Sequence, residues 1–375
     1  MDCDVVVVGL GAMGSAAVGE CALRGSSVVG LEQFPRGHDR GSSSGLSRII
    51  RKAYFEDPAY VPLVLRAYEK WRELEHAAKS ELLRITGLLM VGEENAEVIT
   101  GATRAAREHR LPFEQLDAAE IRARYPSLRL EPQEIGIYEP EGGVLDPERA
   151  VEAQLTRASE AGAHLCFEVA MRSWRARKGG FVLELSDGTS LKSKALILSL
   201  GPWFQQTLAS LGVDLRVQRN VQAWFTPTTE EYAAGRFPPF LLDRAGFPAP
   251  LYGFPDFGHG VKAAFHSCGE LSEPDQFNRE IDRERDIEPI VRAMDQWMPG
   301  AAAGFRAAKP CPYSLTPDGH FVVDRHPAHP RLILSGGFSG HGFKFAPVMG
   351  EIAAELALEG ATRYEIGFLS LKRFL

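Results

Sequence analysis

The first residues whose types and spacing could do chemistry are the glycines of a turn near the N-terminus. Residues 9–14 read GLGAMG, a GxGxxG motif that follows the β-branched run Asp4–Val8 and precedes the Ala-rich segment Ser15–Arg24. Between a buried strand and a helix, such glycines admit a pyrophosphate to the helix N-terminus. Glu32, 18 residues after the last glycine, ends a second strand over residues 27–32. Its carboxylate can bind ribose hydroxyls and would repel the extra phosphate of NADP. The motif predicts a dinucleotide site and does not choose between NAD and FAD.

Two arginines form a second candidate site. Segment 41–54 reads GSSSGLSRIIRKAY, with two isoleucines between Arg48 and Arg51. Two guanidiniums three residues apart, on a helix or on a loop entering one, can face the same cavity, one toward a flavin and the other toward a substrate carboxylate. The alternative is a solvated charge run, which Ile49 and Ile50 disfavour because the segment must then be partly buried.

Three basic residues in the second half of the chain are further candidates. Lys262 and His266 are four residues apart in VKAAFHS, which we expect to be a strand. Residues four apart on a strand share a face, so both side chains could reach one cavity. Lys344 falls in the first turn of the last expected helix, where the helix dipole disfavours a cation, so we expect another role for it. The alternatives are core packing for His266, as for Tyr252, and a surface position for Lys344.

The composition limits the possible partners. The 375 residues include 42 Lys and Arg and 49 Asp and Glu, a net charge of −7, so we expect no nucleic-acid partner. The five cysteines are scattered and form no CxxC pair, which argues against a disulfide framework and against a structural zinc site. The sequence also lacks an HExxH motif, so we expect no other metal site. Without a signal peptide or an apolar stretch of about 18 residues, the chain is expected in the reducing cytoplasm, away from membranes, with small molecules as partners.

These candidates need two kinds of scaffold. The N-terminal βαβ pattern and the apolar runs 195–200 and 331–335 are typical of a parallel sheet covered by helices. We expect helices over residues 15–24, 59–79, 96–110, 117–125, 147–161 and 343–359, a strand over 87–92 and a hairpin over 181–191. Residues 217–304 are rich in Pro, Phe and Tyr and in short alternating stretches, which indicates an antiparallel sheet. The predicted fold class is therefore α/β plus antiparallel β: a Rossmann-like domain with an inserted mixed or antiparallel-sheet domain.

Four regions, in order along the whole chain, carry a resemblance to a known family. They read GLGAMGSAA, SRIIRKAY, YGFPDFGHGVKAAFHSCGE and, near the C-terminus, CPYSLTPDGHFVVDRHP with GGFSGHGFKFAPVMGE. With them the chain resembles the sarcosine oxidase group of FAD-dependent amine oxidases, which includes sarcosine, N-methyltryptophan and pipecolate oxidases. The resemblance implies FAD, bound by a discontinuous domain of residues 1–86, 146–216 and 305–375, and a substrate domain of residues 87–145 and 217–304.

The resemblance also implies a reaction. A hydride would pass from the carbon next to a neutral secondary amine to the flavin, giving an imine, and O2 would be reduced to hydrogen peroxide. The expected substrates are sarcosine, an N-methyl amino acid or a cyclic imino acid such as pipecolate, and the expected assembly is a monomer or small homo-oligomer. The alternatives are a flavin-dependent dehydrogenase with another acceptor, an oxidase of glycated amino acids, a nicotinamide-dependent dehydrogenase and a flavin-binding protein without activity.

The same resemblance implies roles for individual residues. Cys311, which we expect to be partly exposed beside Lys309, would bond covalently to the flavin. Lys262 would lie over the flavin, where a fixed ammonium stabilises superoxide. The expected catalytic residues are Lys262, Arg48, Tyr252 and His266, and the expected substrate-binding residues are Arg51, Lys344, Tyr252 and His266. The expected cofactor-binding residues are Gly9, Gly11, Met13, Gly14, Glu32, Gln33, Ser42, Ser43, Arg48, Gly201, Trp203, Cys311, Gly340, Gly342, Phe343 and Lys344.

Two details bear on the substrate. Arg51 and Lys344 have no acid adjacent to them in sequence, so in one enclosed pocket they would repel each other unless an anion such as the substrate carboxylate sat between them. Sarcosine and N-methyltryptophan oxidases carry a His-His pair where this chain has Ser43 and Ser44. In this loop and in the segments RIIRKAY and TPD…DRHP, the sequence of this chain is more similar to the pipecolate and peroxisomal sarcosine oxidase branch. Hydroxyls in place of imidazoles leave no titrating group there, so the identity of the amine stays open.

Overall fold

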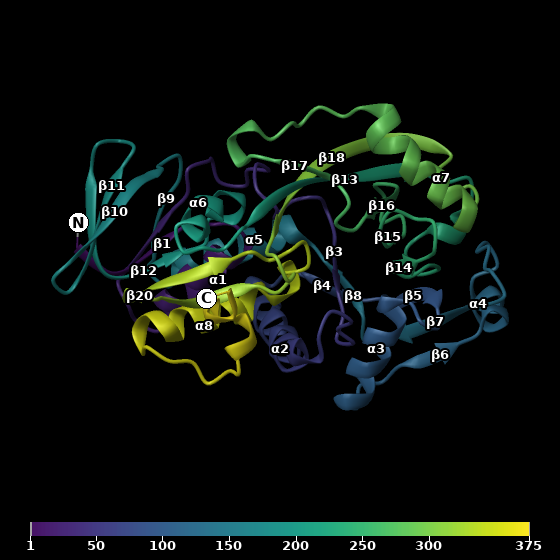
Figure 1. Cartoon of the computed structure of the whole chain (residues 1–375), viewed down its shortest axis with the longest axis horizontal. Coiled ribbons are helices and arrows are strands. Elements are labelled where there is room, and N and C mark those ends of the chain that lie inside the picture. Colours follow the sequence, from purple (N-terminus) through teal and green to yellow (C-terminus); the bar gives the residue numbers. More distant parts are fainter. Residues whose placement is uncertain (1, 375) are drawn as a thin grey trace.

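The computed structural model describes residues 2–374, which form two large β-sheets side by side (Figure 1). The strands of the first sheet are β1 (Asp2–Val8), β2 (Val28–Leu31), β9 (His164–Cys166), β10 (Met171–Arg177), β11 (Gly180–Leu185), β12 (Ser190–Leu198), β19 (Val322–His326) and β20 (His329–Gly336). This eight-stranded sheet has the order β10-β11-β12-β1-β2-β9, with β20 paired to β12 and β19 paired to β20. The N-terminal βαβ unit and the hairpin around 181–191 are present as the sequence predicts.

The apolar run of β1 is explained by burial on both faces. β1 pairs in parallel with β2 and with β12. Val5 and Val7 pack in a core with the helices on one face, whereas Val6 and Val8 pack in a second core on the other. Alternate residues of a strand point to opposite faces, so only a continuous apolar run suits this position.

The helices largely match the expected segments. They are α1 (Ala12–Leu23), α2 (Val61–Ala78), α3 (Glu97–Glu108), α4 (Ala118–Arg124), α5 (Pro147–Glu160), α6 (Gln205–Ala209), α7 (Glu288–Trp297) and α8 (Ala346–Leu358). The segment expected as the last helix begins with a separate 3₁₀ turn, Phe343–Phe345, so Lys344 lies just before α8 rather than inside it. Among the helices of residues 2–374, each is too short or too polar to span a bilayer.

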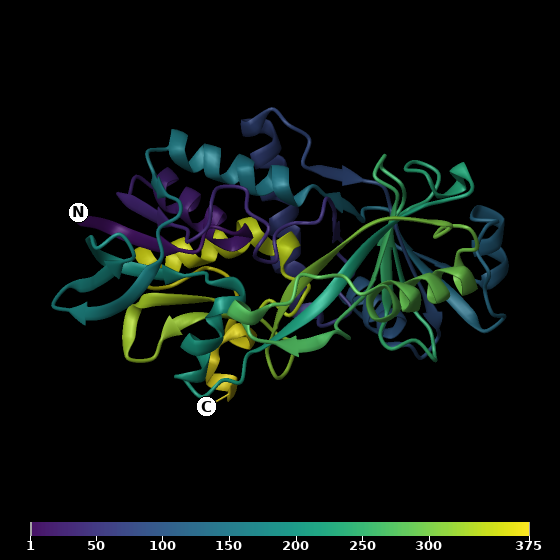
Figure 2. The ribbon, with the colours of Figure 1, turned by 90° about the horizontal axis from the view of Figure 1, so that it is seen from above.

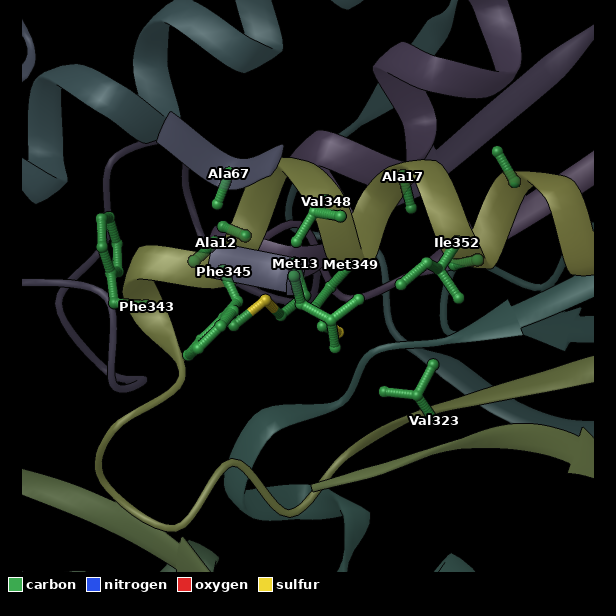
Figure 3. Close-up of a cluster of buried hydrophobic side chains, with 14 of the residues drawn as sticks. Ala12, Met13, Ala17, Ala67, Val323, Phe343, Phe345, Val348, Met349 and Ile352 are labelled. Atoms are coloured by element: carbon green, nitrogen blue, oxygen red, sulfur yellow. The ribbon is translucent and has the colours of Figure 1, made fainter. Parts of the chain in front are cut away.

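Helices α1 and α8 pack against each other beneath the first sheet. A Cβ on Gly350 of α8 would lie 2.5 Å from the Cβ of Ala16, so this contact requires glycine. Figure 3 shows Met13 of α1 among the side chains of Phe345 and Met349, in a cluster of buried residues from several elements. The turn that carries the GxGxxG motif is therefore held by the core on one side and is open on the other.

The second large sheet has nine strands. They are β5 (Leu88–Glu93), β6 (Glu114–Leu116), β7 (Glu134–Glu139), β13 (Arg216–Thr226), β14 (Phe240–Asp243), β15 (Leu251–Phe254), β16 (Val261–Phe265), β17 (Glu270–Ser272) and β18 (Gly304–Leu315). The order is β17-β13-β16-β15-β14-β5-β7-β6, with β18 paired to β13, and the pairing is antiparallel except between β14 and β5. The expected mixed or antiparallel sheet is confirmed, and Figure 2 shows it beside the helix-covered first sheet.

The arginine segment forms a strand, which corrects one expectation. A small third sheet contains β3 (Arg48–Ile50), β4 (Leu83–Ile85) and β8 (Gly143–Leu145). Arg48 and Arg51 therefore lie on and just after a strand, not on a helix or on a loop entering one. β-Branched isoleucines favour the extended conformation, and β8 supplies the partner strand.

The division into domains remains a proposal, and the strand pairing changes its details. Strand β18, which we assigned to the cofactor domain, pairs along nearly its whole length with β13 of the nine-stranded sheet. The small sheet joins β3 and β4, which the sequence predicts in the cofactor domain, to β8, which it predicts in the substrate domain. We therefore propose that the last cofactor-domain segment begins after β18, near residue 316.

Candidate functional site

One cavity of about 1430 Å³ extends from the GxGxxG turn, past the carboxyl ends of β1, β2, β12 and β20, to side chains of the nine-stranded sheet. Ligands of open α/β sheets bind at these strand ends. The cavity brings together most of the expected site residues: Gly9, Gly11, Met13, Glu32, Gln33, Ser42, Ser43, Arg48, Arg51, Gly201, Trp203, Tyr252, His266, Cys311, Gly340, Gly342, Phe343 and Lys344. Gly14 and Lys262 do not line it.

The three glycines of the motif have different structural tasks. Gly9 has φ +87°, and a Cβ there would lie 2.2 Å from the backbone oxygen of Ser199. A Cβ on Gly14 would lie 1.7 Å from the oxygen of Gly9. The first glycine therefore allows the close approach of the chain after β12, and the third allows α1 to pack against the end of β1. A Cβ on Gly11 would meet only the Oγ of Ser43, at 3.2 Å. Gly11 is therefore the position where a ligand can approach the start of α1.

Gly14→Ala is expected to destabilise the protein and weaken cofactor binding, because its methyl group would overlap the oxygen of Gly9 and push α1 away from β1. Overpacking of this kind typically costs about 1–3 kcal/mol. Gly19→Ala is the matched control in the same helix, since its Cβ would lie 3.7 Å from the nearest atom. Thermal unfolding and FAD content of both variants check this, and equal behaviour of the two would contradict it.

Glu32 occupies the expected place at the end of β2. Its Oε2 accepts a hydrogen bond from the backbone N–H of Leu10 at 2.9 Å, and its Oε1 accepts one from Phe34 at 3.2 Å. Burial would raise the pKa of this carboxyl, but His38 and the two backbone donors outweigh burial and hold the pKa below its usual value. A buried carboxylate is thus kept charged beside the glycine turn, where it can accept hydrogen bonds from hydroxyl groups.

Trp203 and its neighbours form the outer side of the cavity. The indole Nε1 of Trp203 donates to Asp275 Oδ1 at 2.7 Å, and its ring lies 5.2 Å from that of Phe34. Arg279 donates to the backbone oxygen of Arg40 at 2.6 Å. These contacts hold the segment between β17 and α7 against the loop that follows β2.

The serine-rich loop joins the start of α1 to the arginine strand. The Oγ of Ser43 accepts a hydrogen bond from the backbone N–H of Ala12 at 3.0 Å. The guanidinium of Arg48 donates to three backbone oxygens in residues 42–47, two of them at 2.8 and 2.9 Å. Arg48 therefore fixes the conformation of this loop at the cavity wall, a function that the sequence did not reveal.

Neighbouring strands of the nine-stranded sheet present one face to the site. The register places Trp224 of β13 opposite Lys262 of β16, and Asn220 of β13 opposite Cys311 of β18. Gln222 lies on β13 between Asn220 and Trp224. Alternate residues of a strand share a face, so Lys262, Gln222 and Cys311 lie on the same face of the sheet. Of these three residues, Gln222 and Cys311 line the large cavity.

Lys262 is buried, and its ammonium is held by oxygen atoms. It donates to Gly45 O at 2.7 Å, Ser47 O at 2.9 Å and Ser47 Oγ at 3.2 Å. Burial and the nearby Arg48 guanidinium lower the pKa of Lys262 well below its usual value. It lines a separate cavity of about 250 Å³, so the expectation that Lys262 and His266 face one cavity is wrong. The ammonium of Lys262 is bonded to the Gly45 and Ser47 oxygens, whereas the ring of His266, just after β16, lines the large cavity.

Cys311 is more enclosed than expected. Its side chain is buried rather than partly exposed, although it lines the large cavity. The ammonium of Lys309 pairs with Asp39 at 3.1 Å, so it is not free to stabilise a thiolate. Access to this sulfur is through the cavity.

Glu56 is the main site residue that the sequence did not reveal. The Nη2 of Arg51 lies 2.7 Å from Glu56 Oε1 and 2.5 Å from Oε2, while Nη1 donates to Ala53 O at 3.1 Å. Burial raises the pKa of Glu56, but the charge of Arg51 above all, with that of Lys344, lowers it to about 2. The expectation that Arg51 and Lys344 lack a neighbouring acid is therefore wrong: the chain supplies this anion five residues after Arg51.

Lys344 lies across the same pocket. Its Nζ donates to His341 O at 2.6 Å and lies 5.2 Å from the centre of the Tyr54 ring. Burial and the positive charge of Arg51, opposed by Glu56, lower the pKa of Lys344 to about 7. Its charge at neutral pH thus depends on what else is in the pocket.

A buried tyrosine and a histidine complete this charged region. The Nε2 of His341 donates to Gly319 O at 3.1 Å, because a carbonyl oxygen can only accept. Its Nδ1 then accepts from the hydroxyl of Tyr54. Burial lowers the pKa of His341 to about 3, which keeps the ring neutral and its tautomer fixed. Sequence reasoning missed both residues, whose contact spans 287 positions.

Aromatic rings form the wall opposite the loop. Tyr252 and Tyr313 approach each other through their hydroxyls at 3.4 Å, and the His266 ring lies 5.6 Å from that of Tyr313. Burial lowers the pKa of His266 to about 4, so its imidazole is neutral at pH 7. This end of the cavity combines neutral aromatic groups with the charged set of Arg51, Glu56 and Lys344.

The cavity residues fit FAD. Gly11 leaves the start of α1 open, Glu32 can take hydroxyl groups, and the cavity continues as far as Cys311. Two buried polar atoms of cavity residues, Gln222 Oε1 and Ser335 Oγ, have no hydrogen-bond partner within the described chain. Such atoms are expected where a ligand completes the site. Within residues 2–374, no cluster of three or more His, Cys, Asp or Glu side chains is arranged to hold a metal ion.

Comparisons with known proteins agree with this fit. Residues 4–356 match the FAD dependent oxidoreductase family. The chain is 40% identical to a monomeric sarcosine oxidase of Streptomyces avermitilis, covering 99% of this chain and 97% of that protein. It is 31% identical to an N-methyl-L-tryptophan oxidase of Yersinia pestis over the full length of both. Among solved structures it is similar to NikD, an unusual amino acid oxidase, with a TM-score of 0.85, 25% identity and coverage of 98% and 97%. The cavity, the glycine turn and these relatives all indicate a flavin enzyme, and the chain belongs to the FAD dependent oxidoreductase family.

Proposed function

We propose that this protein is an FAD-dependent oxidase of a secondary amino acid, such as sarcosine, an N-methyl amino acid or a cyclic imino acid, with O2 as the electron acceptor. The observation that carries the proposal is one cavity that joins the dinucleotide turn at Gly11 to a buried cationic pair, Arg51 and Lys344, under an aromatic wall. The relatives named as sarcosine and N-methyl-L-tryptophan oxidases support the same substrate class.

The chain's own residues would bind and orient the substrate. When bound, FAD would supply the redox chemistry, as the acceptor of a hydride from the carbon next to the amine nitrogen. Arg51 and Lys344 would hold the carboxylate, and the amine would then lie toward Tyr252 and His266, which line the same cavity. The neutral imidazole of His266 adds no charge that would compete for the carboxylate. Selectivity for amino acids over plain amines follows from this arrangement.

A peroxide-coupled screen tests the proposal. Sarcosine, N-methyl amino acids, proline, pipecolate and glycated amino acids are offered to the purified protein in air. Peroxide formation from a secondary amino acid is the expected result. Amine oxidation that reduces a dye or quinone without forming peroxide would favour a dehydrogenase, and turnover of glycated amino acids alone would favour the other alternative. No oxidation of any member of the screen would contradict the proposal.

Binding of a substrate carboxylate is expected to depend on pH through Lys344, whose pKa is about 7 in the free protein. A bound anion favours the protonated ammonium and raises this pKa, so binding takes up a proton. Affinity is expected to be constant well below pH 7 and to fall by up to about tenfold per pH unit above it. Titration with a carboxylic acid that lacks an oxidisable amine, read by visible absorbance, measures this. Lys344→Met should bind weakly and without this pH dependence; an unchanged profile would contradict the assignment.

We also propose that Cys311 carries FAD covalently. The sulfur is buried on the cavity wall and lies on the sheet face that also carries Gln222 and Lys262. Acid precipitation of the wild type is expected to give a yellow pellet, and Cys311→Ser should release its FAD to the supernatant. Cys268→Ser, at an exposed cysteine outside the cavity, is the control and should keep the colour. A colourless wild-type pellet would contradict the tether.

Cellular location and assembly complete the proposal. We propose a cytoplasmic enzyme, which is supported by five free cysteines, Cys3, Cys21, Cys166, Cys268 and Cys311. We propose a monomer or a small homo-oligomer, and sedimentation of the holoenzyme measures this directly.

A further inference from the structure

Gln222 has a buried amide that the fold does not satisfy. Its side chain is 2% exposed and lines the large cavity. Its Oε1 has no hydrogen-bond partner within residues 2–374. A buried amide oxygen without a partner costs free energy, and such groups in folded proteins usually await a ligand or a water molecule. This glutamine therefore calls for an explanation that packing does not provide.

Its neighbour on the same strand face shows the contrast. Asn220 Oδ1 accepts from the backbone N–H groups of Cys268 and Gly269, both at 3.2 Å. Its Nδ2 donates to the side-chain oxygen of Gln218 at 3.2 Å. Asn220 is thus a structural amide that joins a loop to β13, whereas the amide of Gln222 two residues later has no such function.

Gln222 lies between the residues assigned to the cofactor. On β13 it is two residues from Asn220, which faces Cys311, and two residues from Trp224, which faces Lys262. Two residues along a strand span about 6.6 Å, a distance comparable to the width of a flavin ring. The amide therefore stands between the proposed point of attachment and the proposed oxygen-activating lysine.

The amide also packs against the loop that carries the site. A Cβ on Gly45 would lie 2.3 Å from Gln222 Oε1 and 3.2 Å from Arg48 Nη1. Lys262 donates to the oxygen of the same Gly45, whose φ is +117°. Three polar side chains thus converge on one glycine, and two of them are cations with hydrogen-bond partners of their own. Only the neutral amide lacks a partner: its Oε1 is enclosed against the Gly45 loop, and its Nε2 is the amide atom left to face the cavity, so a ligand there can bind Nε2 directly or Oε1 after rotation of the amide.

We propose that Gln222 is a further cofactor-contacting residue, whose amide hydrogen-bonds to the polar edge of the flavin ring and favours the reduced form. Reduction adds electrons and a proton to the ring, so it creates an N–H donor and makes the ring oxygens better acceptors. A side-chain amide can accept from the first and, after rotation, donate to the second. The inference depends on FAD binding, which follows from the family, and not on the identity of the amine.

The test is the midpoint potential of the bound flavin. Holoenzymes with Gln222→Leu and Gln222→Met are equilibrated with a redox dye under anaerobic conditions and compared with the wild type by visible absorbance. Both variants are expected to shift the potential to more negative values and to change the flavin spectrum. Gln154→Leu is the matched control, since Gln154 is 5% exposed, lies on α5 and does not line the cavity. It should leave the potential unchanged.

The outcomes separate cofactor contact from a structural role. A potential and spectrum equal to those of the wild type, in whichever Gln222 variant retains FAD, would overturn the proposal. An equal shift in Gln154→Leu would also overturn it, because the effect would then come from general loosening of the protein. A wild type that binds FAD and oxidises no amine would contradict the proposed function and leave this measurement interpretable.

Discussion

Lys262→Met is expected to slow the reaction of the reduced enzyme with oxygen by about 10²–10³-fold, the usual loss when a preorganised electrostatic group is removed. Anaerobic reduction by the substrate should change far less. The reason is the position of Lys262, a buried cation on the sheet face that also carries Gln222 and Cys311. Oxygen acquires negative charge when it is reduced, and a fixed ammonium stabilises that charge.

The hydrogen bonds of Lys262 support a charged state despite its burial. Three oxygen atoms, from Gly45 and Ser47, lie within 3.2 Å of Nζ. An ammonium has three N–H donors for them, whereas a neutral amine has two. Because burial and Arg48 lower the pKa of Lys262, oxygen reactivity should decline at a pH below the usual range of a lysine.

Stopped-flow measurement of the two half-reactions checks this prediction. Lys309→Met is the control, since Lys309 lies on β18, separated from β16 by β13, and pairs with Asp39 outside the wall of the large cavity. It should leave both half-reactions nearly unchanged. If Lys262→Met instead abolished reduction and left reoxidation intact, Lys262 would be a substrate residue. Lys262 also holds the oxygens of Gly45 and Ser47. Loss of these hydrogen bonds in Lys262→Met should lower the thermal stability of the protein, which is measured separately from the two half-reactions.

Arg51→Ala is expected to weaken the binding of a carboxylate ligand by about 2–5 kcal/mol, the usual range for truncating one member of a buried charge pair. The effect should be large because two things happen together. The ligand loses a guanidinium, and Glu56 is left unpaired in the pocket, where its negative charge repels the incoming carboxylate.

Glu56 allows the two contributions to be separated. Glu56→Gln should bind the ligand more tightly than the wild type, since Arg51 no longer has an internal partner. Arg51→Ala with Glu56→Gln should recover part of the affinity lost in Arg51→Ala. Lys52→Met, next in sequence but paired with Glu141 at 2.9 Å and absent from the cavity wall, should be neutral. Equal affinity in the wild type, Arg51→Ala and Lys344→Ala would show that no clamp exists, as would faster turnover of a decarboxylated amine than of its parent amino acid.

Much of the first sheet could be predicted because its signals are local. The valines of β1 and the glycines at 9–14 specify strand, turn and helix within one short stretch, and Asp146 caps α5 three residues from its partner Arg149. The resemblance to a family then located residues far apart in sequence on one wall. Gly14 was grouped with the cofactor contacts, although its close approach to Gly9 makes it a packing residue.

The charged interior of the site could not be predicted, because it depends on tertiary contacts. Glu56 reaches Arg51 only because the chain turns after β3, and the pairing of His341 with Tyr54 joins opposite ends of the sequence. Gln222 gave no signal, since a glutamine in an alternating strand usually faces solvent. The strand conformation of β3 itself depended on β8, almost a hundred residues later.

The large cavity draws its walls from both sheets: Gly11 and Glu32 follow strands of one, and Gln222 and Cys311 belong to the other. A cofactor that fills this cavity therefore contacts both structural units at once and links them. Because binding to the folded state is lost when either unit opens, the free energy of binding couples their unfolding. Flavin supply during synthesis would then decide whether the two halves resist proteolysis as one body or as two.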